Sequence, residues 1–343
     1  MNYKIAVTDI NVSRKEQDIL STLTNWLPKQ VLDIHTHFGL LKNVLRIDDK
    51  IKDTPMVDFL YCDYQTHQRF NSLLSGIQII QAAFAFPFQG IDIISANKYI
   101  LNLAQVYDNI IPFLTGLPEN KKGIQYTISE IVSGRYYGLK CYAQRLEKKA
   151  SKITDFFTEN ILEAVNFMNL PIVLHIPGEL KESLSEILDL ADKYAEIKFI
   201  IAHMGRAYML SKEYPQLLEK IKQTHLDNIF FDTSFCMDFR VIKCALEIIG
   251  YEKILYGSDQ PSNMIRGRVY KHPSRGVRIM TNQKYSWVND DEWEYYKNQI
   301  GGLIYVELEM LLALKKVLDS LPSPEIAKQN VFFNNAAKLL KII

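Results

Sequence analysis

The stretch VLDIHTHFG, residues 31–39, reads as a buried β-strand that carries two histidines two positions apart. Side chains alternate along a strand, so His35 and His37 should share one face with Asp33. The opposite face should then carry Leu32, Ile34 and Thr36. Two imidazoles on one face can hold a metal ion, although strand histidines also occur as hydrogen-bonded core residues. The segment alone leaves both interpretations open.

Length and charge limit the class of protein. A chain of 343 residues can build one large α/β barrel or two average domains. Its net charge of +1 gives no global field for nucleic acid or an anionic membrane surface, so we expect a small-molecule substrate instead. No segment approaches the roughly 20 apolar residues of a membrane span, and the N-terminus lacks a signal-like apolar core. Four scattered cysteines without CxxC spacing fit reduced thiols, so we expect a cytoplasmic protein.

Strand-like apolar segments alternate with helical patterns along the chain. Eight segments have the nearly continuous apolar character of parallel strands covered on both faces: 31–37, 77–87, 109–117, 136–143, 171–178, 198–205, 228–235 and 253–261. Helical periodicity separates many of them, as at 154–168, 180–195 and 238–250. The alternation predicts an α/β fold, a closed (β/α)8 TIM barrel. An open doubly wound sheet is the alternative, but it would normally have a glycine-rich turn after its first strand.

The remaining segments are expected to complete one domain over residues 1–343. Ser13 and Glu16 form a capping-box pattern for a helix through Trp26, and we expect this N-terminal region, 1–30, to plug the barrel floor. Long insertions should follow strands one and eight, and two amphipathic helices should end the domain. These three regions are 38–76, 262–302 and 303–343.

Polar residues of unusual type fall near the carboxyl ends of the predicted strands. There are six of them: His35, His37, Lys140, His175, His203 and Asp259. In a barrel these strand ends meet at one rim, where functional groups gather. Their shared position favours one functional site over six unrelated core residues.

The ordered motifs DIHTH, GLKCY, VLHIPG, IAHMG and YGSDQP resemble the amidohydrolase superfamily from residue 31 to the end of the chain. Barrels of that superfamily carry an HxH pair on strand one, an optional lysine on strand four, histidines on strands five and six, and an aspartate on strand eight. The late segment NVFFNNAAKLL resembles the closing helix of the branch that contains aminocarboxymuconate semialdehyde decarboxylase. The resemblance implies a metal-dependent TIM-barrel enzyme.

The resemblance also implies which residues hold the metal. The expected ligands are His35, His37, His175 and Asp259. Three imidazoles and a carboxylate suit Zn²⁺, and Mn²⁺ or Fe²⁺ are compatible with the same set. We expect one ion rather than two, because the resemblance is to the mononuclear branch. Asp259 is the expected general base that activates a water and later protonates the leaving group.

Three further residues near the predicted ligands have candidate roles. His203 should hydrogen-bond the water or polarise the reacting carbonyl, as its counterpart does in the resembling family, or else support the ligands structurally. Lys140 has three alternatives: a carboxylated bridge between two metals, a substrate-binding group, or an inert packed side chain. Arg206, at the start of the loop after His203, is a candidate for binding an anionic substrate.

The second insertion contains a basic segment, 264–278, with five cationic side chains and no acidic one. Arginines bind carboxylate and phosphate groups in a bidentate manner, so this segment could recognise an anionic substrate. A solvated loop or a contact between subunits explains the same composition. In the first insertion, His67 and Arg69 are weaker candidates for pocket walls.

We expect a metal-dependent hydrolase that cleaves an amide, lactone or ester-like bond in a small anionic molecule. The alternative is a metal-dependent non-oxidative decarboxylase, because the same ligands serve both reactions and fold does not settle chemistry. A non-catalytic binding protein with a structural metal is a third hypothesis, and it would have a closed coordination sphere. The sequence leaves the oligomeric state open, although a homodimer is compatible with the resemblance and the long insertions.

Overall fold

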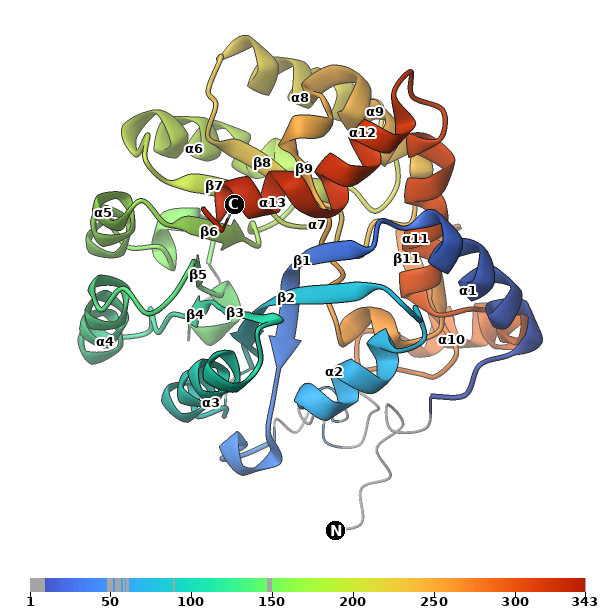
Figure 1. Cartoon of the computed structure of the whole chain (residues 1–343), viewed down its shortest axis with the longest axis horizontal. Helices are drawn as coiled ribbons and strands as arrows, with labels where there is room; N and C mark the ends of the chain where they lie inside the picture. Colours follow the sequence, from blue (N-terminus) through green and yellow to red (C-terminus); the bar gives the residue numbers. More distant parts are fainter. Residues whose placement is uncertain are drawn as a thin grey trace.

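The computed structural model describes residues 10–47, 52, 57, 59, 62–88, 90–146 and 150–342, and parallel strands lie at its centre (Figure 1). These strands are β1 (Gln30–Phe38), β2 (Gln78–Ala85), β3 (Ile110–Pro112), β4 (Leu114–Thr115), β5 (Leu139–Lys140), β6 (Pro171–Leu174), β7 (Lys198–Ile201), β8 (Ile229–Asp232) and β9 (Ile254–Leu255). Segments β3 and β4 are two parts of the third barrel strand, separated by Phe113, whose N–H still donates to Ala83 O at 2.9 Å.

Hydrogen bonds between β1 and the chain after β9 close the barrel. Parallel ladders join β1, β2 and β3 in order, and a second set joins β4 through β9. At the remaining seam Ile34 N–H donates to Tyr256 O at 3.0 Å, and His37 N–H donates to Gln260 O at 2.7 Å. The predicted (β/α)8 barrel is therefore confirmed.

Helices surround the strands on the outside (Figure 1). They are α2 (Tyr64–Asn71), α3 (Ile93–Val106), α4 (Lys121–Val132), α5 (Glu159–Met168), α6 (Leu180–Lys193), α8 (Tyr214–Gln223), α9 (Phe239–Ile249) and α11 (Val306–Leu318). Side-chain caps start several of them, as where Asp92 accepts from Ser95 N–H and Asn120 accepts from Gly123 N–H. The helix predicted at 154–168 is shorter than expected, because a separate 3-10 turn at Ile153–Asp155 precedes α5.

Strand β1 contains a β-bulge that sets the direction of its side chains. Its pairing with β2 shifts register between Asp33 and Thr36, so β1 has one more residue than β2 over this stretch. Ile34 belongs to the apolar cluster inside the barrel, and the ring of His35 lies 5.3 Å from the interior ring of Phe84. The predicted alternation, with Asp33 and His35 on one face and Ile34 on the other, is wrong because the bulge interrupts it.

Asp33 lies on the outer side of β1 and stabilises the bulge. Its carboxylate oxygen Oδ1 accepts hydrogen bonds from the backbone N–H groups of His35, at 3.1 Å, and Ser258, at 2.9 Å. Leu32, the preceding residue, joins the interior cluster with Ile34. The side chain of Asp33 thus serves backbone groups at the seam of the barrel, not the site that His35 faces.

The barrel floor is closed by the C-terminal segment. Strand residues inside the barrel, among them Leu32, Val173 and Leu255, pack with Ala336, Ala337 and Leu340 at α13 (Asn335–Leu339). Between α12 (Pro324–Gln329) and α13 the chain has π-helical turns at Asn330–Asn334.

Helix α1 (Arg14–Trp26) has the predicted capping box at Ser13 and Glu16. It packs against α11 outside the strands, and the ring of Trp26 meets that of Phe332 edge-on with centroids 5.6 Å apart. The expectation that this helix plugs the barrel floor is wrong, because α13 already occupies that position.

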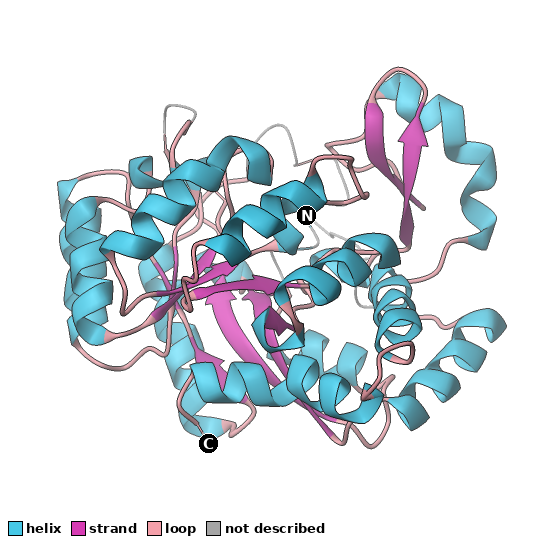
Figure 2. Ribbon diagram, turned by 90° about the horizontal axis from the view of Figure 1, so that it is seen from above, coloured by secondary structure: helices cyan, strands magenta, loops and turns pink. Residues whose placement is uncertain are grey.

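The second insertion forms a β-hairpin and a helix that project from the barrel (Figure 2). Strands β10 (Gly267–His272) and β11 (Gly276–Thr281) pair antiparallel, and α10 (Asp290–Tyr296) follows them. Carboxylates engage three of the five cations of the basic segment at 2.7 to 2.9 Å, in the pairs Arg266–Glu16, Arg275–Asp291 and Arg278–Glu292. Two of these pairs therefore hold the insertion together, and the pair with Glu16 joins it to the segment Arg14–Trp26.

The contact between Phe332 and Tyr256 yields a stability prediction. Phe332 is fully buried, and its ring centroid lies 4.9 Å from that of Tyr256. Phe332→Ala should lower the free energy of unfolding by about 3–5 kcal/mol, because a large buried side chain leaves a cavity. Urea denaturation measures this change. The matched control is Phe167→Ala, which removes a ring that is 83% exposed, and a similar loss in both variants would contradict the prediction.

Candidate metal centre

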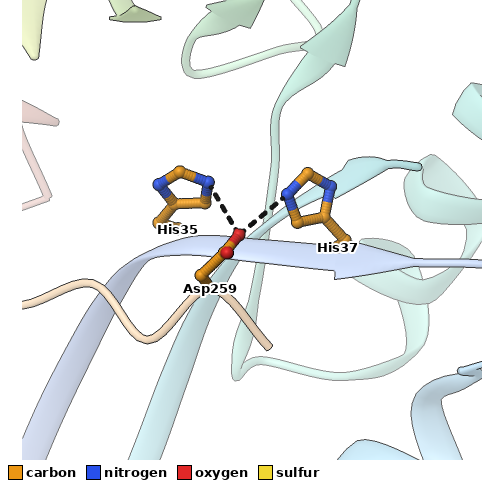
Figure 3. Close-up of side chains that lie close together, drawn as sticks. All are labelled: His35, His37 and Asp259. Atoms are coloured by element: carbon orange, nitrogen blue, oxygen red, sulfur yellow. Dashed lines mark ion pairs between the residues drawn. The ribbon is translucent and has the colours of Figure 1, made fainter. Parts of the chain in front are cut away.

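Two histidines and an aspartate meet at one end of the barrel (Figure 3). His35 and His37 come from β1, and Asp259 follows β9. The carboxylate oxygen Oδ1 of Asp259 lies 3.2 Å from Nε2 of each histidine. In the described part of the chain these three form the one group whose potential ligand atoms all lie within 4.8 Å of one another. Two imidazole nitrogens and a carboxylate oxygen are suitable donors for a divalent metal ion.

The backbone of the barrel seam fixes the position of Asp259. Its N–H donates to His35 O at 2.9 Å, and its own carbonyl accepts from Ser262 N–H at 2.7 Å. The φ angle of Asp259 is 64°, a left-handed conformation that costs a residue other than glycine about 1–2 kcal/mol. Strained conformations of this kind occur at functional sites. The carboxylate is therefore directed at the two histidines by hydrogen bonds of the fold itself.

Two further predicted residues, His175 and His203, line the same cavity. His175 follows β6, and its Nδ1 lies 3.1 Å from Nε2 of His203, which follows β7. The ring of His203 is 5.1 Å from that of His35. His175 is not part of the group that meets the 4.8 Å limit, so its assignment as a metal ligand stays a prediction.

His203 lies in a left-handed turn. Residues 203–206 all have positive φ angles, which are 57°, 52°, 73° and 61°. Tyr214 donates a hydrogen bond to Met204 O at 3.0 Å, and His203 N–H donates to the carboxylate of Asp232 at 2.8 Å. These contacts hold the turn, which is labelled α7 (His203–Arg206) although its dihedral angles are not those of a right-handed helix.

Lys140, from the end of β5, is fully buried beside His35. Its Nζ lies 2.5 Å from His35 Nε2, and 4.4 Å and 4.8 Å from the ring centroids of Phe84 and Tyr142. Burial lowers the pKa of Lys140 to about 7, although Asp259 and Asp232 favour its charged form. A neutral amine is therefore well populated at neutral pH. This state is compatible with carboxylation, with substrate binding and with simple packing.

Burial and hydrogen bonds set the charges of the site. Burial raises the pKa of Asp259, but hydrogen bonds with His35 and His37 outweigh it and keep the pKa well below its ordinary range. Burial lowers the pKa of His37 to about 3 and that of His203 to about 4. At neutral pH Asp259 is thus a carboxylate and His37 and His203 are neutral imidazoles, the states that a metal ion requires. Burial and the charge of Lys140 lower the pKa of His35, but Asp232 and Asp259 outweigh them and raise it.

Asp232 and Tyr142 also belong to the site, and sequence reasoning missed both. Asp232 Oδ2 lies 2.8 Å from His35 Nδ1, while the hydroxyl of Tyr142 lies 3.2 Å from His37 Nε2. Burial raises the pKa of Asp232, but the charge and hydrogen bond of His35 outweigh it and lower that pKa. The sequence feature that could have identified Asp232 as a site residue is its place at the end of a predicted strand, in NIFFDTSF.

The cavity above the cluster has a volume of about 290 Å³ and mostly aromatic walls. Its lining includes Phe59, Phe86, Phe88, Tyr142, Tyr208, Phe235 and Trp287, together with the six predicted rim residues. Trp287 is 41% exposed, and its ring stacks on that of Tyr285 with centroids 4.6 Å apart. Trp287 and Ile279 both belong to the second insertion, so this insertion helps to enclose the cavity.

Arg206 lies beside this cavity. It lines a neighbouring hollow, and Tyr208 lines both. One guanidinium nitrogen of Arg206 donates to Gly178 O at 3.1 Å, and its Nε has no hydrogen-bond partner among the described residues. Its predicted role in binding the substrate is neither confirmed nor contradicted by this position.

Behind β1 lies a second set of buried polar groups. His67 contacts His37 O through Nε2 and Gln260 Oε1 through Nδ1, both at 2.8 Å, so it braces the seam and does not line the cavity. Glu307, from α11, accepts hydrogen bonds from Tyr256 at 2.6 Å and from Gln260 at 3.1 Å. This network supports the chain on both sides of Asp259.

The sequence profile of the amidohydrolase family matches residues 32–342. The chain belongs to the amidohydrolase family. No curated protein matches it significantly by sequence. In the described residues of this amidohydrolase-family protein, no helix is both long and apolar enough to cross a membrane.

Solved structures share the fold at low sequence identity. The 5-carboxyvanillate decarboxylase of Sphingomonas paucimobilis is 14% identical with a TM-score of 0.61, over 92% of this chain and 99% of that one. A dihydroxybenzoic acid decarboxylase of Polaromonas with bound manganese is 14% identical with a TM-score of 0.57, over 92% and 98% of the two chains. A probable 2-pyrone-4,6-dicarboxylic acid hydrolase of Acinetobacter baumannii is 14% identical with a TM-score of 0.56, over 91% and 99%.

Asp33 yields a prediction about pH and stability. Burial raises its pKa to about 8, and the nearby Glu307 acts in the same direction. The ordinary value of about 3.9 applies to the unfolded chain. Between these values the folded protein binds more protons, so the contribution of Asp33 to stability is greatest below pH 4 and is lost as the pH rises toward 8.

Asp33→Asn should remove this part of the pH dependence. Between pH 5 and pH 8.5 the free energy of unfolding, measured in urea, should fall less in the variant than in the wild-type protein. Asp18→Asn, on the exposed face of α1, is the matched control and should retain the wild-type slope. Equal slopes for Asp33→Asn and the wild type would show that Asp33 is not the buried acid responsible.

Proposed function

We propose that this protein is a metal-dependent hydrolase that cleaves an amide, lactone or ester-like bond in a small anionic molecule. The observation that carries the proposal is the convergence of His35, His37 and Asp259 at the base of an aromatic cavity. Membership of the amidohydrolase family supports an enzymatic role for this cluster. The distant structural relatives support the fold but do not identify the reaction.

The proposed metal is one divalent cation, Zn²⁺ in preference to Mn²⁺ or Fe²⁺. His35, His37 and Asp259 would hold it, with His175 as the proposed fourth ligand. Imidazole-rich sets with a carboxylate suit zinc, but the manganese in a structural relative shows that a related fold accepts that ion. When bound, the cation would polarise the scissile carbonyl and make a water molecule more acidic.

Asp259 is the proposed general base. It is ionised at neutral pH because His35 and His37 lower its pKa, so it can accept a proton from the attacking water. The same carboxyl group would then pass this proton to the leaving group. Its oxygen lies 3.2 Å from each of the two imidazoles, which limits its movement during these steps.

Other cavity residues would position the substrate. His203 is neutral at pH 7 because burial lowers its pKa to about 4, so it can hydrogen-bond the reacting water without adding charge. Tyr142 presents a hydroxyl beside His37. Arg206, next to Tyr208 at the edge of the cavity, is the proposed partner for an anionic group of the substrate.

Non-oxidative decarboxylation is the second candidate, and the aromatic cavity walls favour it. Rings such as Phe86, Phe235 and Trp287 suit a planar unsaturated acid, which they can contact face-on or edge-on. In this reaction the cation would anchor the substrate carboxylate, and an acid of the site would protonate the carbon that loses CO₂. The same ligands serve both reactions.

Product analysis separates the two candidates. The metal-loaded protein would be incubated in ¹⁸O-labelled water with small amides, lactones, and aromatic or enoic acids. Hydrolysis should place one ¹⁸O atom in the product without release of CO₂. Release of CO₂ with a solvent proton on the product carbon would establish decarboxylation instead. Absence of turnover with every class, in a protein shown to bind metal, would favour the binding-protein hypothesis.

Asp259→Asn should lower kcat by about 100- to 10,000-fold, the usual range for loss of a general base. The amide keeps the size of the side chain and one oxygen donor, so much of the bound metal should remain. Steady-state kinetics and elemental analysis measure the two effects separately. The matched control is Asp92→Asn, at the cap of α3, which should keep normal kcat. Near-normal turnover in Asp259→Asn would refute its assignment as the base.

A further inference from the structure

Asp232, at the end of β8, contacts His35, His203 and Ser234. Its side chain is fully buried. One oxygen, Oδ2, faces His35 Nδ1 at 2.8 Å. The other, Oδ1, accepts from the backbone N–H of His203 at 2.8 Å, from the backbone N–H of Ser234 at 3.0 Å, and from the Ser234 hydroxyl.

The contact with His35 determines which ring nitrogen carries the proton. An ionised carboxylate can only accept hydrogen bonds, so Nδ1 of His35 must be the donor. In the neutral imidazole, Nε2 then has the lone pair, and Lys140 Nζ lies 2.5 Å from Nε2. This is the nitrogen that lies 3.2 Å from Oδ1 of Asp259. The lone pair is therefore directed at the position where a cation would be held between the two residues.

Ser234 extends the same constraint to His203. The hydroxyl group of Ser234 has one proton, which it donates to Asp232, so toward other groups it can only accept. Nδ1 of His203 lies 2.9 Å from this hydroxyl oxygen and 3.2 Å from the carbonyl oxygen of Ser234. Both oxygens can only accept a hydrogen bond here, so Nδ1 of His203 carries the proton and its Nε2 has the lone pair.

The tautomer of His175 follows from that of His203. Nε2 of His203 lies 3.1 Å from Nδ1 of His175. Because His203 Nε2 is an acceptor, His175 Nδ1 must donate, and Nε2 of His175 keeps its lone pair. One carboxylate thus fixes the proton positions of three imidazoles from three different strands.

We propose that Asp232, acting with Ser234, is a positioning residue that holds His35, His203 and His175 as Nδ1–H tautomers, so that the Nε2 lone pairs of His35 and His175 are available to the cation while that of His203 accepts from His175. Its consequence for metal affinity rests on the proposed function, but the tautomers themselves do not. Asp232 does not touch the reacting atoms. Partners of this kind orient metal-binding histidines in other proteins and raise their basicity.

The substitution Asp232→Asn tests the contact with His35 selectively. The two backbone N–H groups and the serine hydroxyl all donate to Oδ1, so the amide oxygen of asparagine should take that position. The amide NH₂ then replaces Oδ2 and donates to His35 Nδ1, which forces the proton of the neutral ring onto Nε2. A ring protonated on Nε2 cannot bind a metal ion through that nitrogen.

Zinc affinity, measured by competition with a chelating dye, should fall about 10- to 100-fold in Asp232→Asn. The matched control is Asp238→Asn, which changes an aspartate that caps α9 six residues later and should keep wild-type affinity. A folded Asp232→Asn protein that binds zinc as tightly as the wild type would overturn the proposal.

Nuclear magnetic resonance of the wild-type protein gives a test that requires neither metal nor substrate. Long-range ¹H–¹⁵N correlations at pH 8, assigned with single His→Gln variants, should show His203 and His175 protonated on Nδ1. Ser234→Ala should release His203 from this constraint and leave the contact of Asp232 with His35 in place. Protonation of His203 on Nε2 in the wild type would overturn the proposal even if Asp232→Asn fails to fold. A wild type with the expected tautomers but no zinc affinity would instead refute the proposed function alone.

Discussion

The β-bulge in β1 is the constraint on which the site depends. Without the extra residue between Asp33 and Thr36, regular alternation would place Ile34 and His35 on opposite faces. With it, both point into the barrel, so a strand that is apolar at the floor becomes polar at the rim. Bulges often redirect side chains beside active sites, and here the bulge places His35 and His37 on the interior side of the strand, with Leu32 and Ile34.

The hydrogen bonds that close the barrel also bring the residues of the site together. The N–H of Asp259 donates to the carbonyl of His35, and the N–H of His37 donates to Gln260 O. The backbone hydrogen bonds between β1 and the segment that follows β9 therefore also set the spacing of the three potential ligands. His67 and Glu307 support this seam from behind through Gln260. Unfolding of the seam would separate the ligands.

The strands, the rim and most site residues could be predicted from sequence, because apolar runs and the C-terminal ends of parallel strands have fixed geometric meanings. The bulge could not, since the segment DIHT, residues 33–36, contains no glycine or other local signal of an extra residue. Asp232 was missed because its role depends on contacts with residues far away in the sequence. The floor was assigned to the wrong helix for a similar reason, as amphipathic periodicity shows that a helix packs but not where.

Charge balance explains why this cluster is suited to a divalent cation. Asp232 and Asp259 are both buried, and both have lowered pKa values, so the cavity contains two negative charges. Without a cation, protons must compensate them. Burial and the charge of Lys140 lower the pKa of His35, but Asp232 and Asp259 together outweigh these effects and raise it. A divalent ion supplies the same two positive charges while His35 and Lys140 become neutral, so its binding should release protons. The apolar walls strengthen these interactions because they lower the local dielectric constant. The aromatic cavity therefore does more than fit a substrate: it makes uncompensated charge at its base costly, and so favours the metal-bound state.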